Sequence, residues 1–329
     1  MKLSSASAIV ALLFSGQAFS LPAPVPAPGA ANDSLAPFIS RSHMDVAEWW
    51  AIDADHDYRL TYLSAYAWTE DVKPPYHFIS PQFYAGIWNP RADDPSINKT
   101  CSMTGQSYTT FLRQHKRYIG MGYRPRMIKA FSGNNHWSGL VKYVAIWVED
   151  VDAGSVEWKA ELGLSTDKFV ELFNQYVKEG YRLTHVSGYE EVGLSDGTQP
   201  GSRSGLPYYT AIWEKRPHET DSAKRWEARI GLTSQQYQRA VTQKKAAGLR
   251  PVLVEGYTVG NVDYFAAIWE EAAEEGLVGW QARHDLTEER YEEVNKDLAA
   301  KGFVPTVVSL YGDGVSATAK YAGIWEKWN

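Results

Sequence analysis

Tyr209-Thr210-Ala211-Ile212-Trp213 is one of five copies of a short phrase made of an aromatic residue, a variable residue, a small residue, isoleucine and tryptophan. The other copies occupy residues 84–88, 143–147, 265–269 and 321–325, and successive tryptophans lie 59, 66, 56 and 56 residues apart. A phrase that returns at such intervals is typical of tandem units that stack on one another. The sequence therefore predicts five copies of one folding unit, and it says more about architecture than about activity.

Each unit carries the signals of one helix followed by two strands. In the third unit, the hydroxyl of Ser165 can cap a helix start, and apolar residues recur at helical spacing from Phe169 to Val177. Gly180 suits the left-handed conformation that ends a helix. A strand then returns through a turn-rich stretch as the Ile-Trp strand, which indicates an antiparallel hairpin. We expect an α+β fold of five helix plus antiparallel β-hairpin repeats, stacked into an arc or a closed ring.

The other units repeat these signals with small differences. The matching cap positions are Ser42, Thr104, Thr233 and Thr287. Gly122 follows Thr104 by 18 residues, against 15 from Ser165 to Gly180, so we expect the second helix to be longer by about one turn. Seven positions before the cap stands a large apolar residue, Trp158 in the third unit, which predicts a short lead-in helix or turn with a core anchor.

Two further expectations concern the hairpins. The residue before each Ile-Trp pair is alanine or glycine, which we expect to let a helix approach the strand closely. Antiparallel pairing would set Arg182 opposite Glu214 and Arg250 opposite Glu270. We therefore predict an ion pair within each of these two units.

The ends of the chain differ from the repeats. Residues 1–20 combine a basic start, an apolar run and small residues at Ala18 and Ser20, which is typical of a secretory signal peptide. Residues 21–37 are rich in proline and alanine and predict a linker. Residues 38–329 then form a single repeat domain, with units at about 42–88, 104–147, 165–213, 233–269 and 287–325. We expect a secreted, extracellular protein, and sequons at Asn32 and Asn98 predict a glycoprotein.

Composition argues against several classes of function. The net charge is −6 over 329 residues and no basic patch is present, so we expect no nucleic-acid partner. No stretch approaches the roughly 18 apolar residues of a membrane span, so we expect no membrane partner. Cys101 is the single cysteine, so an internal disulfide is precluded and the core must hold the fold.

Candidate ligand-binding residues lie in the hairpin tips, whose lengths vary while the helices stay nearly constant. A constant scaffold with variable tips is typical of proteins that carry their function on loops. Aromatic, asparagine and histidine side chains in the first two tips could bind sugars or an extended peptide: Trp68, Tyr76, His77, Asn134, His136 and Trp137. Alternatively, the tryptophans fold back onto the scaffold.

Motifs for chemistry are weak. Ser165 and Lys168 match a Ser-x-x-Lys nucleophile motif, but threonine fills the same cap position in other units and the partner motifs are missing. Asp53, Asp55 and Asp57 start like a calcium loop, yet its glycine and final glutamate are absent. The eight histidines show no metal-binding spacing. We therefore predict no catalytic residue, no metal and no cofactor.

Several stretches resemble the bacterial tandem-repeat domain family. They are the Gly-Tyr-Arg-Pro segment at 122–125, the repeated Ala-Ile-Trp strand, and the Trp-x-Ala to Gly-Leu-Ser/Thr leads at 158–165 and 226–233. In fungi this is similar to the N-terminal domain of polyglycine hydrolases, which are secreted proteases that cut glycine-rich linkers in plant chitinases. The resemblance covers about residues 40–329.

The resemblance also implies a role. In that family a β-lactamase-like catalytic domain with a Ser-x-x-Lys nucleophile follows the repeats. Because the sequence ends at Asn329, directly after the fifth unit, we expect the repeat domain without that catalytic domain. By analogy, the repeats would help to hold or position a protein substrate.

We therefore expect a secreted, non-catalytic repeat protein that binds an extracellular protein, peptide or glycan. Two alternatives stay open. One is a hydrolase or other enzyme whose site is assembled between repeats, for example from His77, His136 and carboxylates around a hollow. The other is a purely structural or decoy protein without a ligand.

Overall fold

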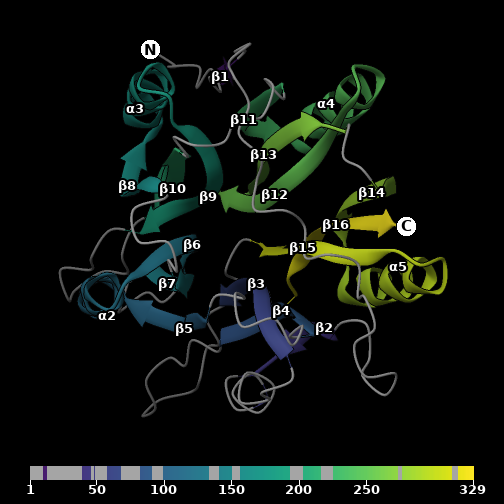
Figure 1. Cartoon of the computed structure of the whole chain (residues 1–329), viewed down its shortest axis with the longest axis horizontal. Coiled ribbons are helices and arrows are strands. Elements are labelled where there is room, and N and C mark those ends of the chain that lie inside the picture. Colours follow the sequence, from purple (N-terminus) through teal and green to yellow (C-terminus); the bar gives the residue numbers. More distant parts are fainter. Residues whose placement is uncertain are drawn as a thin grey trace.

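The computed structural model describes residues 10–12, 39–45, 48, 58–67, 82–90, 99–132, 141–149, 156–192, 203–215, 225–272, 276–312 and 318–329. Within these ranges the molecule is mainly β, with five antiparallel sheets and a helix in each of the last four units. Figure 1 shows the sheets arranged around a common centre with the helices at the outside. The predicted tandem repeat with antiparallel pairing is confirmed, although strands outweigh helices.

Each sheet places the Ile-Trp strand between two others. From the first unit to the fifth, these middle strands are β4 (Gln82–Pro90), β7 (Val141–Glu149), β10 (Arg203–Lys215), β13 (Val262–Glu271) and β16 (Lys320–Trp328). The inner strands, nearest the common centre, are β3 (Tyr58–Ala67), β6 (Tyr123–Ser132), β9 (Arg182–Val192), β12 (Leu249–Val259) and β15 (Val304–Tyr311). The outer strands are β2 (Ile39–Met44), β5 (Thr100–Ser107), β8 (Glu157–Ser165), β11 (Trp226–Thr233) and β14 (Leu277–Leu286). A short strand β1 (Val10–Leu12) pairs with the far edge of β11.

The outer strands overturn the prediction of a lead-in helix or turn. In the third unit, Trp158 pairs with Glu214 and Ala160 pairs with Ile212 of the middle strand. Residues two apart lie on the same face of a strand, so the recurring Trp-x-Ala spacing is a strand signal. Each unit is therefore a three-stranded sheet and a helix, and the predicted hairpin is only its inner part.

The four described helices have thirteen residues each and follow the outer strands directly. They are α2 (Tyr108–Gly120), α3 (Thr166–Lys178), α4 (Ser234–Ala246) and α5 (Glu288–Ala300). Ser165, Thr233 and Thr287 cap their helices as predicted, because each side chain accepts a bond from the backbone amide three residues on. Gly180 has a φ of 88°, which confirms it as a helix terminator.

Two predicted caps are wrong. The cap of α2 is Ser107, whose side chain accepts from the amide of Thr110, while Thr104 lies inside β5. The second helix is therefore no longer than the others, and the extra residues belong to the strand. Ser42 lies in β2, and Asp45 and Glu48 instead exchange the reciprocal bonds of a capping box.

The tryptophans of the five phrases form the core of their units, as predicted. All five are 0 % exposed: Trp88, Trp147, Trp213, Trp269 and Trp325. Helix aromatics pack over them, and the ring of Tyr291 lies 5.6 Å from that of Trp325. The small residue has another role than predicted in two units, since a Cβ on Gly86 would lie 2.5 Å from the ring of Trp88. There it makes room for the tryptophan two positions on.

The inner strands connect all five units. Strand β3 contacts β6, β6 contacts β9, β9 contacts β12, β12 contacts β15, and β15 contacts β3. Between the last and first units, the amide of Leu310 donates to Oγ of Ser64 at 2.8 Å, and the hydroxyl of Tyr321 donates to the carbonyl of Ser42 at 3.0 Å. The first and fifth units therefore touch through their inner strands and where the middle strand β16 meets the outer strand β2.

Buried ion pairs join three neighbouring pairs of units. They link Arg124 to Glu214, Arg182 to Glu270, and Arg250 to Glu326. Arg182 and Glu214 face each other across the strands of one unit, as do Arg250 and Glu270, which agrees with the predicted register. The ion pairs of Arg182 and Arg250 with the glutamate of the following unit were not predicted from the sequence.

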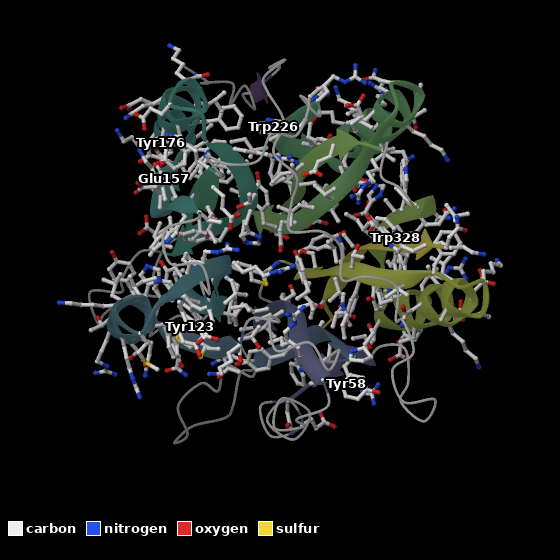
Figure 2. All side chains as sticks on the ribbon, in the orientation of Figure 1. Tyr58, Tyr123, Glu157, Tyr176, Trp226 and Trp328 are labelled. Atoms are coloured by element: carbon white, nitrogen blue, oxygen red, sulfur yellow. The ribbon has the colours of Figure 1, made fainter. Side chains whose placement is uncertain are left out.

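Aromatic rings accompany these interfaces. The guanidinium of Arg182 lies 5.6 Å from the ring centre of Trp226, and that of Arg250 lies 6.0 Å from Trp328. Figure 2 shows Trp226 between the third and fourth units and Trp328 between the fourth and fifth. The interfaces between units are thus packed with side chains, and each one fixes the angle between two sheets.

Candidate functional site

The predicted ligand residues lie outside the described residues. They are Trp68, Tyr76, His77, Asn134, His136 and Trp137, and the sequons at Asn32 and Asn98 lie outside as well. The described strands show only where these tips start. Strand β3 ends at Ala67 and β6 ends at Ser132, so both tips leave the sheets at the end of the inner strands.

At the centre, equivalent positions of the inner strands carry polar residues. Register against the middle strands aligns Ser64, Lys129, Ser187, Glu255 and Ser309, which pair with the residue immediately before the small residue of each phrase. All five are at most 2 % exposed. Burial of a lysine and a glutamate is costly unless they are paired, so this layer needs internal partners.

The partners come from different units and form a central cluster of Tyr62, Lys129, Glu255 and Ser309. The ammonium of Lys129 lies 2.5 Å from Oε2 of Glu255 and 3.1 Å from Oγ of Ser309. Ser309 donates to the same carboxylate oxygen at 2.8 Å, and the hydroxyl of Tyr62 donates to Oε1. Burial raises the pKa of Tyr62 well above its usual value, and the charge of Glu255 raises it further.

A serine, a lysine and a carboxylate in contact are groups that also occur in catalytic sites. The geometry of Ser309, Lys129 and Glu255 fits a structural role instead. Lys129 donates hydrogen bonds to both Glu255 and Ser309, so it acts as a hydrogen-bond donor to Ser309 in this arrangement. The oxygen of Ser309 also accepts from the amide of Gly256 at 3.0 Å, so its bonding capacity is filled. Glu255 and Ser309 are both 0 % exposed, so these two groups are closed to a ligand in this conformation.

His185 borders the cluster on β9. Its Nε2 lies 3.1 Å from the carbonyl oxygen of Ile128, so the neutral ring carries its proton on Nε2. Burial lowers the pKa of His185 to about 4, against the opposing influence of Glu255. His185 is therefore neutral at physiological pH and joins the second and third units through this bond.

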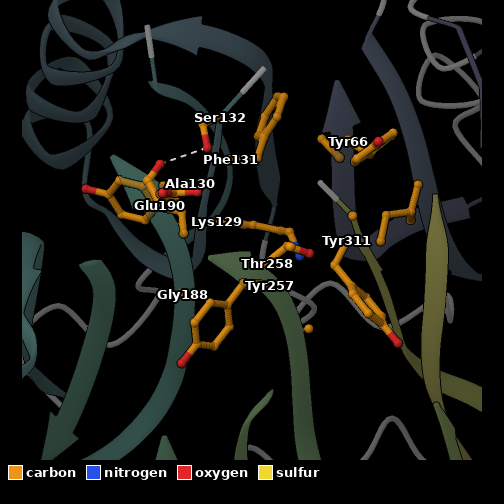
Figure 3. A pocket seen from close by; sticks show the side chains of 15 residues that line it. Tyr66, Lys129, Ala130, Phe131, Ser132, Gly188, Glu190, Tyr257, Thr258 and Tyr311 are labelled. Carbon is orange, nitrogen blue, oxygen red and sulfur yellow. Dashed lines mark hydrogen bonds between the residues drawn. The ribbon is translucent and has the colours of Figure 1, made fainter. Parts of the chain in front are cut away.

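A pocket opens at the end of the inner strands where the hairpins turn (Figure 3). Its aromatic residues are Tyr66, Phe131, Tyr189, Tyr257 and Tyr311, one from each unit, and its polar residues include Lys129, Ser132, Glu190 and Thr258. We call it the central pocket. The space open to a water-sized molecule is about 30 Å³, enough for one small group of a ligand and too little for a whole sugar ring.

The aromatic residues of the central pocket pack onto glycines of the preceding unit. A Cβ on Gly188 would lie 2.5 Å from the ring of Tyr257, and one on Gly256 would lie 2.3 Å from that of Tyr311. Tyr66 approaches Gly312 in the same way, at 2.9 Å. The glycines are needed for this close approach, which seals the side of the pocket and holds the tyrosine rings in place.

Glu190 ties the rim of the pocket together. Its two carboxylate oxygens accept from the amide of Gly205 at 2.8 Å and from that of Gly260 at 2.9 Å, on hairpins of the third and fourth units. Its carbonyl accepts from Ser132 of the second unit at 2.8 Å, as Figure 3 shows. Glu190 thus links three neighbouring units by hydrogen bonds around the opening of the pocket.

Other kinds of site are not formed by the described residues. Within the described ranges, no three histidine, cysteine, aspartate or glutamate side chains gather as they would around a metal ion. In the same part of the chain, no helix is long and apolar enough to cross a membrane. The central pocket and its rim are therefore the candidate site.

The repeats also match a known family. The family described as "Polyglycine hydrolase-like, structural repeat" matches residues 102–150, 155–216, 223–272 and 278–328. The chain belongs to this polyglycine hydrolase-like structural repeat family. Each match spans one outer strand, helix and inner hairpin, so a family unit corresponds to one sheet of the structure. Curated proteins compared with the chain gave no match.

The first unit lies outside the matched residues, yet it is a polyglycine hydrolase-like repeat in form. Its strands follow the same order, β2-β4-β3, and its middle strand carries the same phrase. Sequence reasoning did not find the central cluster or the pocket. One feature of the sequence could have indicated the cluster. Lys129 and Glu255 occupy equivalent positions of the inner strand, and the other units have serine at that position.

Proposed function

We propose that this chain is a secreted, non-catalytic binding module whose five units form a closed ring. In this proposal the ring holds an extracellular peptide or glycan at the end where the hairpins turn. The contacts of β15 with β3 support closure, since they join the last unit to the first. The signal-peptide pattern of residues 1–20 supports secretion.

The observation that carries the binding proposal is the central pocket. A concave site lined by aromatic side chains with a few fixed polar groups is the usual form of a ligand site. Glu190 holds its rim, and the tips with Trp68 and Trp137 follow in sequence from strands that end beside it. Because the pocket is small, it would take one group of the ligand while the tips contact the remainder.

The test is a direct binding measurement on the protein secreted by its own signal. Glycine-rich peptides and chito-oligosaccharides are titrated by calorimetry into the wild type and into Thr258→Leu, which fills the pocket with a larger apolar side chain. Thr242→Leu is the matched control, because Thr242 is exposed on α4. We expect binding of one ligand class, weakened at least about tenfold by Thr258→Leu and unchanged by Thr242→Leu. Absence of binding to either class would refute the proposal.

A further inference from the structure

Four tyrosines form a chain beside the central pocket, at the boundary of the second and third units, and a carboxylate lies next to one end of this chain. They are Tyr108 at the start of α2, Tyr143 on β7, Tyr189 on β9 and Tyr208 on β10, and the carboxylate is Glu191 on β9. We call these five residues the tyrosine cluster. Only Tyr189 is shared with the central pocket.

The rings form a continuous chain between the two units. The ring centres of Tyr108 and Tyr143 are 5.9 Å apart, and those of Tyr189 and Tyr208 are 6.2 Å apart. A side-chain hydrogen bond joins Tyr143 to Tyr189 and so links the two pairs. Tyr143 and Tyr189 are at most 5 % exposed and form the base, whereas Tyr108 is 51 % exposed. The cluster thus presents aromatic surface on a buried, rigid support.

Glu191 gives the cluster a negative charge. The carboxylate is exposed, and its charge is the main cause that raises the pKa of Tyr208, followed by burial and by their hydrogen bond. Burial is the main cause that raises the pKa values of Tyr143 and Tyr189, and the charge of Glu191 adds to it. The partner in that hydrogen bond is a neutral hydroxyl, so the contact does not neutralise the carboxylate.

The repeat does not require these residues. The first helical residue is Thr166 in α3, Ser234 in α4 and Glu288 in α5, where α2 has Tyr108. The fourth unit has Val259 at the position of Glu191, two residues after its inner-strand tyrosine. Packing of a unit therefore does not explain why one boundary combines an exposed tyrosine with a carboxylate.

We propose that the tyrosine cluster binds the cationic side chain of an arginine or lysine on an extracellular peptide or protein. Tyrosine faces attract a cation within about 6 Å of the ring centre, and the carboxylate of Glu191 beside Tyr208 adds a direct ion pair. The net charge of −6 attracts a cationic partner at longer range. This inference rests on the proposed function, because it names the chemistry of the ligand that the hairpin end holds.

The experiment compares two synthetic peptides that differ in one charge. Both are glycine-serine decamers, one with a single central arginine and the other with citrulline, which has nearly the same shape without the charge. Each is titrated into the wild-type protein at low and high salt. We expect the arginine peptide to bind about tenfold more tightly than its twin, and this difference to shrink as salt screens the carboxylate.

Two variants locate the effect. Glu191→Gln and Tyr108→Ala should each remove most of the preference for arginine, and Glu293→Gln, the same charge change on the exposed face of α5, should leave it intact. Melting temperatures within a few degrees of wild type show that the variants fold. Equal binding of both peptides would overturn this inference and leave the proposed function standing. If neither peptide binds, the inference is also overturned. The same holds if only chito-oligosaccharides bind and Tyr108→Ala abolishes that binding. If none of the tested peptides and oligosaccharides binds, the proposed function fails as well.

Discussion

Replacing Lys129 by methionine tests whether the central cluster stabilises the packing of the five units. The ammonium of Lys129 lies 2.5 Å from Glu255, and the two side chains are 2 % and 0 % exposed. Removal of one partner leaves the other charge buried and unpaired, which costs about 3–5 kcal/mol of the free energy of unfolding. For a domain of this size, each kcal/mol lowers the melting temperature by roughly 2 °C, so we expect a fall of about 6–10 °C.

A double variant separates the loss of charge balance from the loss of packing. In Lys129→Met with Glu255→Gln both charges are gone, while the amide oxygen of glutamine still accepts from Tyr62. We expect this protein to recover at least about 2 kcal/mol relative to Lys129→Met alone. The measurement is equilibrium denaturation together with thermal melting of all variants.

A surface pair provides the control. Lys159 pairs with Glu179 at 2.6 Å, with side chains 28 % and 39 % exposed, so Lys159→Met should cost less than about 1 kcal/mol. If Lys129→Met costs no more than Lys159→Met, the cluster does not stabilise the packing of the units. If the double variant is less stable than the single one, charge pairing is not the reason for its stability.

Three further predictions follow from single contacts. Ser64→Ala should cost about 1–3 kcal/mol in a denaturation experiment, because the amide of Leu310 loses its acceptor. Ser187→Ala should be neutral, because that buried hydroxyl has no hydrogen-bond partner among the described residues. Equal costs would show that the bond from Leu310 to Ser64 does not stabilise the contact between the first and last units. Gly256→Ala should lower the melting temperature strongly because its Cβ meets a tyrosine ring at 2.3 Å, and a change under about 1 kcal/mol would contradict the packing described. The pKa of His185 is lowered from 6.5 to about 4, so the unfolded chain binds this proton more tightly than the folded protein does. The free energy of unfolding is therefore unaffected above pH about 6.5 and falls as the pH drops towards 4, by about 2 kcal/mol at pH 5. His185→Phe should flatten this slope, and an unchanged slope would assign the loss to other groups.

The sequence by itself determined the repeat and much of its local structure. The phrase that ends at Trp213 marks the middle strand of its unit, and Ser165 and Gly180 mark the ends of α3, because caps and terminators depend on the chemistry of one residue and its immediate neighbours. The same logic failed at Thr104 and Ser42, where strand pairing extended past a residue that could have been a cap. Pairing partners are distant in sequence, so local signals cannot show where a strand stops.

Only the tertiary structure decided what lies between the units. Lys129 and Glu255 are 126 residues apart and meet because five inner strands share one centre. Tyr143 and Tyr189 likewise come from different units and are joined by a hydrogen bond at a boundary that no single repeat contains. A repeat pattern specifies each unit nearly alone. A site between units depends on how neighbouring sheets pack, and residues far apart in sequence, such as Arg182 and Glu270, meet at these boundaries.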